Sequence, residues 1–200
     1  MIKKYLKKDL EIAGRKMTFE VNKLAPQADA SVIARYGDTE VMVAVMMGAS
    51  KPMADGGVPL TVDFVERLYA GGLIKGSRWV KREGRGSDES ILTGRLIDRS
   101  IRPLFPKDLT NEIQIIVTLL STDNANDHDV LAINAVSAAL SASRIPWGGP
   151  IGAVRVGYIA EHKSLVTNPL VSEMEFSEID LVVSSNSDGV VMIEAGAKQL

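Results

Sequence analysis

The residues best suited to chemistry lie in one basic stretch, residues 75–87, which reads KGSRWVKREGRGS. Its cations and glycines surround a single tryptophan, Trp79, and show neither a helical nor a strand period. From residue 75 to residue 102 the chain carries eight Lys or Arg and four Asp or Glu, whereas the whole chain has a net charge of −2. Phosphates attract such cations and bases stack on aromatic rings, so the stretch indicates a polyanion-binding surface, with single-stranded nucleic acid as the first candidate.

The same stretch has a plainer interpretation. Surface loops often carry Lys and Arg for solubility, and an arginine late in a helix compensates the helix dipole. On a helix with 100° per residue, Arg95, Arg99 and Arg102 fall within about 60° of one another. Ile97 and Ile101 point to the opposite side, into a core. The three arginines therefore share one face, which either contacts a ligand or is simply solvated.

A second candidate site precedes the helix predicted for residues 127–143. Asp123, Asp127 and Asp129 crowd its start, where they could hold a divalent ion, but helix capping and dipole compensation account for the same carboxylates. No zinc spacing is present, because His128 and His162 are far apart in a chain without cysteine. We expect His128 to be solvated. The sequence contains no P-loop, dinucleotide fingerprint or nucleophile elbow.

The length and composition of the chain limit the class of protein. Two hundred residues, of which 46% are hydrophobic and 24% charged, are typical of a packed globular chain. The absence of cysteine excludes disulfides, thiolate metal sites and a cysteine nucleophile. No apolar run approaches the roughly 20 residues that span a bilayer. Because no hydrophobic signal core follows the basic start, we expect a cytoplasmic protein with no membrane partner.

The elements that must position these sites alternate along the chain. Helices are predicted at residues 87–102 and 127–143, and strands at 9–24 (two strands around a Gly-Arg turn), 29–36, 40–47, 60–69, 112–120, 151–159, 164–167, 180–184 and 190–194. The strand at 40–47 is nearly continuous in apolar residues, as in a strand buried on both faces. The helix at 127–143 is apolar almost all round, as in a central helix. This order predicts an α+β domain with layered β-sheet and helices.

Several stretches resemble the first core domain of the polynucleotide phosphorylase family. They follow one another in the family's order and spacing over essentially the whole chain: VERLYAGG (65–72), KREGR (81–85), RLIDRSIRPLFP (95–106), NDHDVLA (126–132), GPIGAVRVG (149–157) and DLVV (180–183). The resemblance implies an RNase PH-like fold (ribosomal protein S5 domain 2-like). It also implies that residues 1–200 are the first RNase PH-like domain, C-terminally incomplete, of a protein whose second core domain, KH domain and S1 domain are absent from this chain.

The family's activity gives further expectations. Its members form homotrimeric rings and degrade single-stranded RNA from the 3′ end, using inorganic phosphate and Mg²⁺ to release nucleoside diphosphates. The basic stretch resembles the constriction that threads the RNA, so Trp79 is expected to stack on bases and Lys81, Arg82 and Arg85 to hold phosphates. The family's second aromatic is Val80 here, which is expected to weaken stacking.

Two arginines of the following helix have two expected roles. Arg99 and Arg102 either contact RNA or form structural salt bridges with Asp98 or Glu83. The sequence alone does not choose between these roles.

The resemblance places no catalytic or metal-binding residue in this chain. The family's phosphate site lies in the second unit, with Gly-Ser-Ser at the start of the buried helix and Asp-Phe-Lys on a later strand. Here the counterparts are Asn-Asp-His (126–128) and Asp-Leu-Val (180–182). A carboxylate stands where phosphate should bind and no cation is expected to replace the lysine, so the chain alone is predicted to be inactive. The alternatives are a non-catalytic RNA-binding or exosome-like ring subunit and a single-unit RNase PH-like exonuclease.

Overall fold

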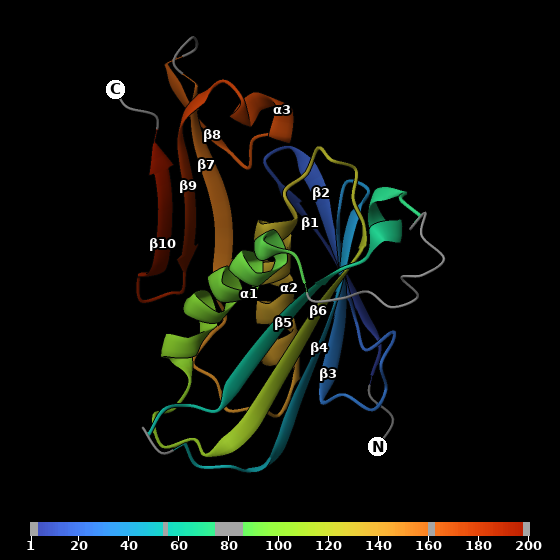
Figure 1. Ribbon diagram of the computed structural model, residues 1–200, viewed down its shortest axis with the longest axis vertical. Helices are drawn as coiled ribbons and strands as arrows, with labels where there is room; N and C mark the ends of the chain where they lie inside the picture. Colours follow the sequence, from blue (N-terminus) through green and yellow to red (C-terminus); the bar gives the residue numbers. More distant parts are fainter. Residues whose placement is uncertain (1–3, 54–55, 75–85, 160–162, 198–200) are drawn as a thin grey trace.

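The computed structural model describes residues 4–53, 56–74, 86–159 and 163–197, which form two β-sheets with helices between them (Figure 1). The helices are α1 (Asp88–Ile101), α2 (His128–Ala142) and α3 (Val171–Met174), with 3₁₀ turns η1 (Leu68–Gly71) and η2 (Arg102–Leu104). The strands are β1 (Leu6–Ile12), β2 (Arg15–Val21), β3 (Ala30–Tyr36), β4 (Thr39–Ser50), β5 (Leu60–Glu66), β6 (Asn111–Ser121), β7 (Gly152–Ile159), β8 (Ser164–Thr167), β9 (Ser177–Ser185) and β10 (Val190–Ala197). The predicted α+β class is confirmed.

The two sheets differ in size and connection. The first has the order β1-β2-β3-β4-β6-β5 and the second β10-β9-β7-β8. Neighbouring strands are antiparallel throughout, except that β5 and β6 run parallel. A parallel pair needs a crossover, and α1 lies in the connection from β5 to β6. This crossover sets α1 beside the edge strand β5.

Helix α2 lies at the centre of the molecule, as predicted. It packs against β3 and β4 on one side and β7 on the other. Its apolar residues are almost completely buried: Val130, Leu131, Ala132, Ile133, Ala135, Val136, Ala139 and Leu140. A helix that is apolar all round needs cover on every side, and the two sheets supply it.

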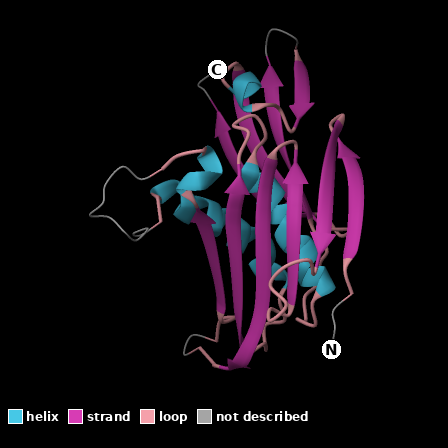
Figure 2. Ribbon diagram, turned by 90° about the vertical axis from the view of Figure 1, so that its right-hand side faces the viewer, coloured by secondary structure: helices cyan, strands magenta, loops and turns pink. Residues whose placement is uncertain are grey.

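Strand β4 corrects one prediction. Val41, Val43 and Val45 are fully buried, but Met46 is 46% exposed and Met42 is half-buried. The strand is therefore not buried on both faces. Figure 2 shows the reason, because the helices lie behind one face of the six-stranded sheet and leave the other uncovered.

The remaining elements follow the predictions, with local differences. The strand predicted to reach residue 69 ends at Glu66, where η1 begins after one residue. The short helix α3 was not predicted. Among the described residues, no helix is long and apolar enough to cross a membrane.

Candidate functional site

The predicted RNA-binding residues fall into two groups. Trp79, Lys81, Arg82 and Arg85 lie outside the described residues. Arg99 and Arg102 lie on α1 and η2, which follow the basic stretch.

The start of α1 is fixed by a local cap. The Ser87 hydroxyl accepts a hydrogen bond from the Ser90 amide at 3.0 Å and donates one to Glu66 at 2.7 Å. Asp88 and Glu89 stand in the first turn, next to the positive end of the helix dipole. The cap therefore ties the beginning of α1 to the end of β5.

The Arg102 side chain makes four hydrogen bonds within the chain. Its Nε and Nη2 donate to the two oxygens of Asp98 at 2.8 and 2.6 Å, the salt bridge that the sequence had left open. Nη1 and Nη2 also donate to the backbone carbonyls of Val58 (3.0 Å) and Leu60 (3.1 Å). The hydrogen bond with Asp98 raises the pKa of Arg102, so the guanidinium stays charged. Arg102 thus links α1 to the beginning of β5. A contact between Arg102 and RNA stays a prediction.

Arg99 is more loosely held. Its Nη1 donates to Glu194 of β10 at 2.7 Å, and both side chains are about half exposed. Glu194 is a partner that the sequence analysis did not name, because the two residues are 95 positions apart. Exposed pairs of this kind contribute about 0–1 kcal/mol, so Arg99 could exchange Glu194 for a phosphate at little cost.

Replacing Arg102 by lysine should lower the free energy of unfolding by about 1–2 kcal/mol, because one ammonium cannot reach Asp98 and both carbonyls at once. Arg99→Lys is the matched control and should change it by less than about 1 kcal/mol. Urea titrations measure both. Equal, small effects would show that Arg102 is as free as Arg99 to contact RNA.

Arg95 is the third arginine of the α1 face. It is exposed and borders a cavity of about 990 Å³ between α1, β5 and η1. Leu68, Leu73 and Ile91 supply apolar walls to this cavity. Asp63, Glu66 and Asp98 also line it, so the cavity combines a cation and apolar surface with carboxylates.

The loop before α2 is organised by Asp123. Its carboxylate accepts hydrogen bonds from the amides of Asp38, Ala125 and Asn126, from the Thr39 hydroxyl and from the Asn126 side chain. Burial alone would raise the pKa of Asp123, but these donors outweigh it and hold the pKa far below its usual range. The acid is therefore structural.

Gly37 is required beside this loop. Its φ is +61°, and a Cβ there would lie 2.3 Å from Nδ2 of Asn126. Only glycine allows the turn between β3 and β4 to approach the Asp123 loop so closely.

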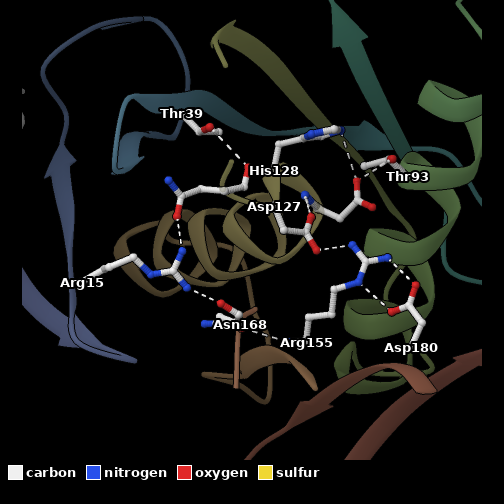
Figure 3. A network of polar contacts seen from close by, with 10 residues as sticks. Arg15, Thr39, Thr93, Asp127, His128, Arg155, Asn168 and Asp180 are labelled. Carbon is white, nitrogen blue, oxygen red and sulfur yellow. Dashed lines mark hydrogen bonds and ion pairs between the residues drawn. The ribbon is translucent and has the colours of Figure 1, made fainter. Parts of the chain in front are cut away.

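Asp127 caps α2 and forms a buried ion pair. One oxygen accepts the Asp129 amide at 2.7 Å, and the other accepts from Nη1 of Arg155 on β7 (Figure 3). Arg155 also donates through Nε and Nη2 to Asp180 on β9, at 2.7 and 2.8 Å. Burial alone would lower the pKa of Arg155. The carboxylates of Asp180 and Asp127 outweigh burial, so the pKa of Arg155 lies above its usual value.

This geometry corrects the expectation that no cation replaces the missing lysine. Arg155 stands between the two acids, so a cation is present, but two carboxylates of the chain already neutralise it. The sequence analysis did not single out Arg155. An arginine inside the apolar run of β7 was the available signal, since a charge buried in a strand needs a partner.

A second guanidinium lies on the other side of the α2 start. Arg15 of β2 donates to the Asn126 side chain and to the Asn168 carbonyl (Figure 3). Its guanidinium also stacks over Tyr36, 4.6 Å from the ring centroid. Asn168 in turn accepts the Arg155 amide at 2.9 Å. These contacts join the two sheets through polar groups, and neither Arg15 nor Asn168 was predicted.

His128 packs against β5, and Asp129 contacts α1. The His128 ring stacks on Phe64 with centroids 5.5 Å apart and is one-third exposed, so the histidine is partly packed as well as partly solvated. Asp129 accepts the Thr93 hydroxyl at 2.7 Å. Burial, and then the charge of Asp127, raises the pKa of Asp129.

The acids of this region do not gather around a common point. Within the described residues, no group of three His, Cys, Asp or Glu side chains could hold a metal ion. Capping, the alternative that the sequence offered for these acids, accounts for Asp127, whereas Asp123 holds the loop before the helix and Asp129 accepts the Thr93 hydroxyl.

Comparison with known proteins gives consistent results. Residues 13–146 match the model of the 3′ exoribonuclease family, domain 1, and residues 149–200 match domain 2 of the same family. The first range contains both long helices and most of the six-stranded sheet. The second contains the four-stranded sheet.

The similar curated proteins are longer than this chain. The polyribonucleotide nucleotidyltransferase of Roseiflexus sp. (strain RS-1) is 50% identical over 192 residues, which are 96% of this chain and 25% of that protein. The protein of the same name from Caldicellulosiruptor bescii is 49% identical, over 96% of this chain and 27% of its own length. The chain thus spans about a quarter of these relatives.

Solved structures share the fold at low identity. All of this chain aligns with 80% of a chain from the Archaeoglobus fulgidus exosome with RNA bound to the active site, with a TM-score of 0.72 and 17% identity. All of it also aligns with 83% of rice Rrp46, with a TM-score of 0.67 and 15% identity. The RNase PH-like fold expected from the sequence is confirmed.

Proposed function

Because the chain belongs to the 3′ exoribonuclease family, we propose that it forms the first RNase PH-like domain of a polyribonucleotide nucleotidyltransferase. The observation that carries this proposal is the 50% identity that extends over 96% of this chain but only 25% of the relative. The second core domain and the KH and S1 domains then belong to the longer protein.

The longer protein is proposed to act in the cytoplasm as a homotrimer. It degrades single-stranded RNA from the 3′ end, with inorganic phosphate as co-substrate and nucleoside diphosphates as products, and Mg²⁺ supports the reaction in the second core domain. The residues described here do not fit the metal, since they offer no cluster of ligands. No step of the reaction is therefore assigned to this unit.

The contacts at the start of α2 support the proposal that this unit does not catalyse phosphorolysis. A phosphate arriving there meets the Asp127 carboxylate, which already occupies the helix N-terminus and one side of Arg155. The other side of Arg155 is held by Asp180. An external anion would have to displace a carboxylate of the chain itself, so the site disfavours phosphate binding.

The contribution of this unit is proposed to be RNA threading and ring contacts. Trp79, Lys81, Arg82 and Arg85 are the proposed RNA contacts. Arg95 and the adjoining cavity support this role, because they offer a cation and apolar surface immediately after the basic stretch. Arg99 can join them by leaving its exposed partner Glu194.

The double variant Lys81→Ala/Arg82→Ala tests the threading role. We expect weaker binding to a fluorescent poly(A) oligonucleotide, with the slope of log K against log salt reduced in magnitude by about 1.4, or about 0.7 for each lost phosphate contact. Lys7→Ala/Lys8→Ala on β1 also removes two positive charges, but far from the basic stretch in sequence. This control should leave the affinity and the salt slope nearly unchanged. Equal losses in both variants would reduce the basic stretch to a solvated surface.

A further inference from the structure

The cavity between α1, β5 and η1 has the size of a ligand site. Its volume of about 990 Å³ falls within the range of about 300–1,000 Å³ that is usual for small-molecule pockets. One face of α1 borders the cavity through residues spaced three or four apart: Ile91, Arg95, Asp98 and Arg102. At Gly94 the helix lies close to β5, since a Cβ there would be 3.4 Å from the Val62 carbonyl oxygen. The cavity is therefore built on packed elements of the fold.

Part of the cavity wall is apolar and accessible. The apolar side chains that line the cavity are between 36% and 62% exposed at four positions: Leu68, Leu73, Ile91 and Ile116. A flat ring placed against them would remove this apolar surface from water. The wall therefore favours a ligand with an aromatic or heteroaromatic ring.

The charges that line the cavity balance one another, but two of them are unpaired. The lining contains three acids and three arginines: Asp63, Glu66, Asp98, Arg67, Arg95 and Arg102. Asp98 pairs with Arg102, and Glu66 accepts the Ser87 hydroxyl. Arg95 and Asp63 are exposed and, in the part of the chain that the structure describes, form no ion pair or side-chain hydrogen bond. One cation and one carboxylate thus remain available to a ligand.

The position of the cavity connects it with the basic stretch. Leu73, two residues before the basic stretch, and Ser87, its last residue, both line the cavity. A ligand that carried only negative charge would leave Asp63 unsatisfied or repelled, and one that carried only positive charge would be repelled by Arg95. The pair suits a ligand with an anion at one end and a neutral hydrogen-bond donor at the other.

We propose that the cavity binds one nucleotide of single-stranded RNA whose base carries an exocyclic amino group. The inference rests on the proposed function, because the nucleotide belongs to the RNA that the basic stretch would hold. Arg95 contacts the phosphate, the apolar wall packs against the base, and Asp63 accepts a hydrogen bond from the amino group. Adenine, guanine and cytosine carry such a group, whereas uracil presents a carbonyl oxygen that a carboxylate repels.

An RNA analogue that lacks only the amino group tests the contact with Asp63. Fluorescence anisotropy compares binding of the 200-residue chain to a labelled adenosine decamer and to the same decamer made of purine riboside. The adenosine decamer should bind at least about fivefold more tightly, because the analogue loses a hydrogen bond to a charged group. Asp63→Ala should remove this preference. Asp108→Ala, which removes an exposed carboxylate outside the cavity, should retain it.

Arg95→Ala tests the phosphate contact in the same assay. It should weaken the binding of both decamers by a similar factor and reduce the magnitude of the slope of log K against log salt by about 0.7. Lys7→Ala on β1 removes the same charge outside the cavity and should leave the affinity and the slope nearly unchanged.

The outcomes separate this inference from the proposed function. Equal affinity of the unsubstituted chain for the two decamers, or a preference that persists in Asp63→Ala, would overturn the nucleotide site. The RNA-binding role would survive either result if Lys81→Ala/Arg82→Ala still weakened binding. If the unsubstituted chain bound neither decamer, the RNA-binding role would fail, and the inference would fail with it.

Discussion

Replacing Arg155 by methionine is expected to lower the free energy of unfolding by about 3 kcal/mol. The change leaves Asp127, whose side chain is 10% exposed, as a buried carboxylate without its cation. Asp180 loses the same partner, but its side chain is 42% exposed, so water can solvate its charge. The expected loss of stability is therefore near the low end of the range for a broken buried ion pair. Urea titration at neutral pH measures the change.

Two further variants separate this explanation from a general loss of packing. Arg99→Met removes an exposed arginine whose carboxylate partner, Glu194, is also about half exposed, and should cost less than about 1 kcal/mol. Adding Asp127→Asn to Arg155→Met should recover part of the stability, since the orphaned charge disappears. The same loss in Arg99→Met and Arg155→Met would contradict the role given to the buried pair.

Asp123→Asn is expected to lower the free energy of unfolding by about 2–3 kcal/mol at pH 7, because an amide cannot accept every hydrogen bond that the carboxylate accepts. The effect depends on pH with a definite sign. The folded-state pKa of Asp123 is depressed, so its contribution is complete above the unfolded-state pKa of about 4 and is lost as pH falls below it. The two proteins should therefore converge in stability from about pH 4 downwards.

The control for this titration is Asp108→Asn, at an exposed position. Urea titrations at several pH values between about 2 and 7 should show a nearly constant, small difference between Asp108→Asn and the unsubstituted protein. A pH-independent difference for Asp123→Asn would mean that its carboxylate charge does not stabilise the loop.

Local signals made the helices predictable. Ser87 and Asp127 cap α1 and α2, and a cap involves only the next two or three residues of the chain. The small helix α3 has a single turn and too few residues to show a period. The strand around β4 was recognised, but its apolar run could not show that helices cover only one face of the sheet.

The ion pairs were less predictable because their partners are remote in sequence. Arg155 meets Asp127 and Asp180 from 28 and 25 residues away. The acids alone indicated repulsion of phosphate, and the family pattern indicated a missing lysine. Only the packing of β7 against the α2 start shows that an arginine has filled the position between them and is neutralised there.

The proposed lack of phosphorolytic activity in this unit can be tested by incubating the chain with poly(A), inorganic phosphate and Mg²⁺ and measuring ADP. A polyribonucleotide nucleotidyltransferase that contains both core domains serves as the positive control. We expect ADP release by the control and none above background by the 200-residue chain. ADP release by the chain, in proportion to its concentration and dependent on phosphate, would contradict it.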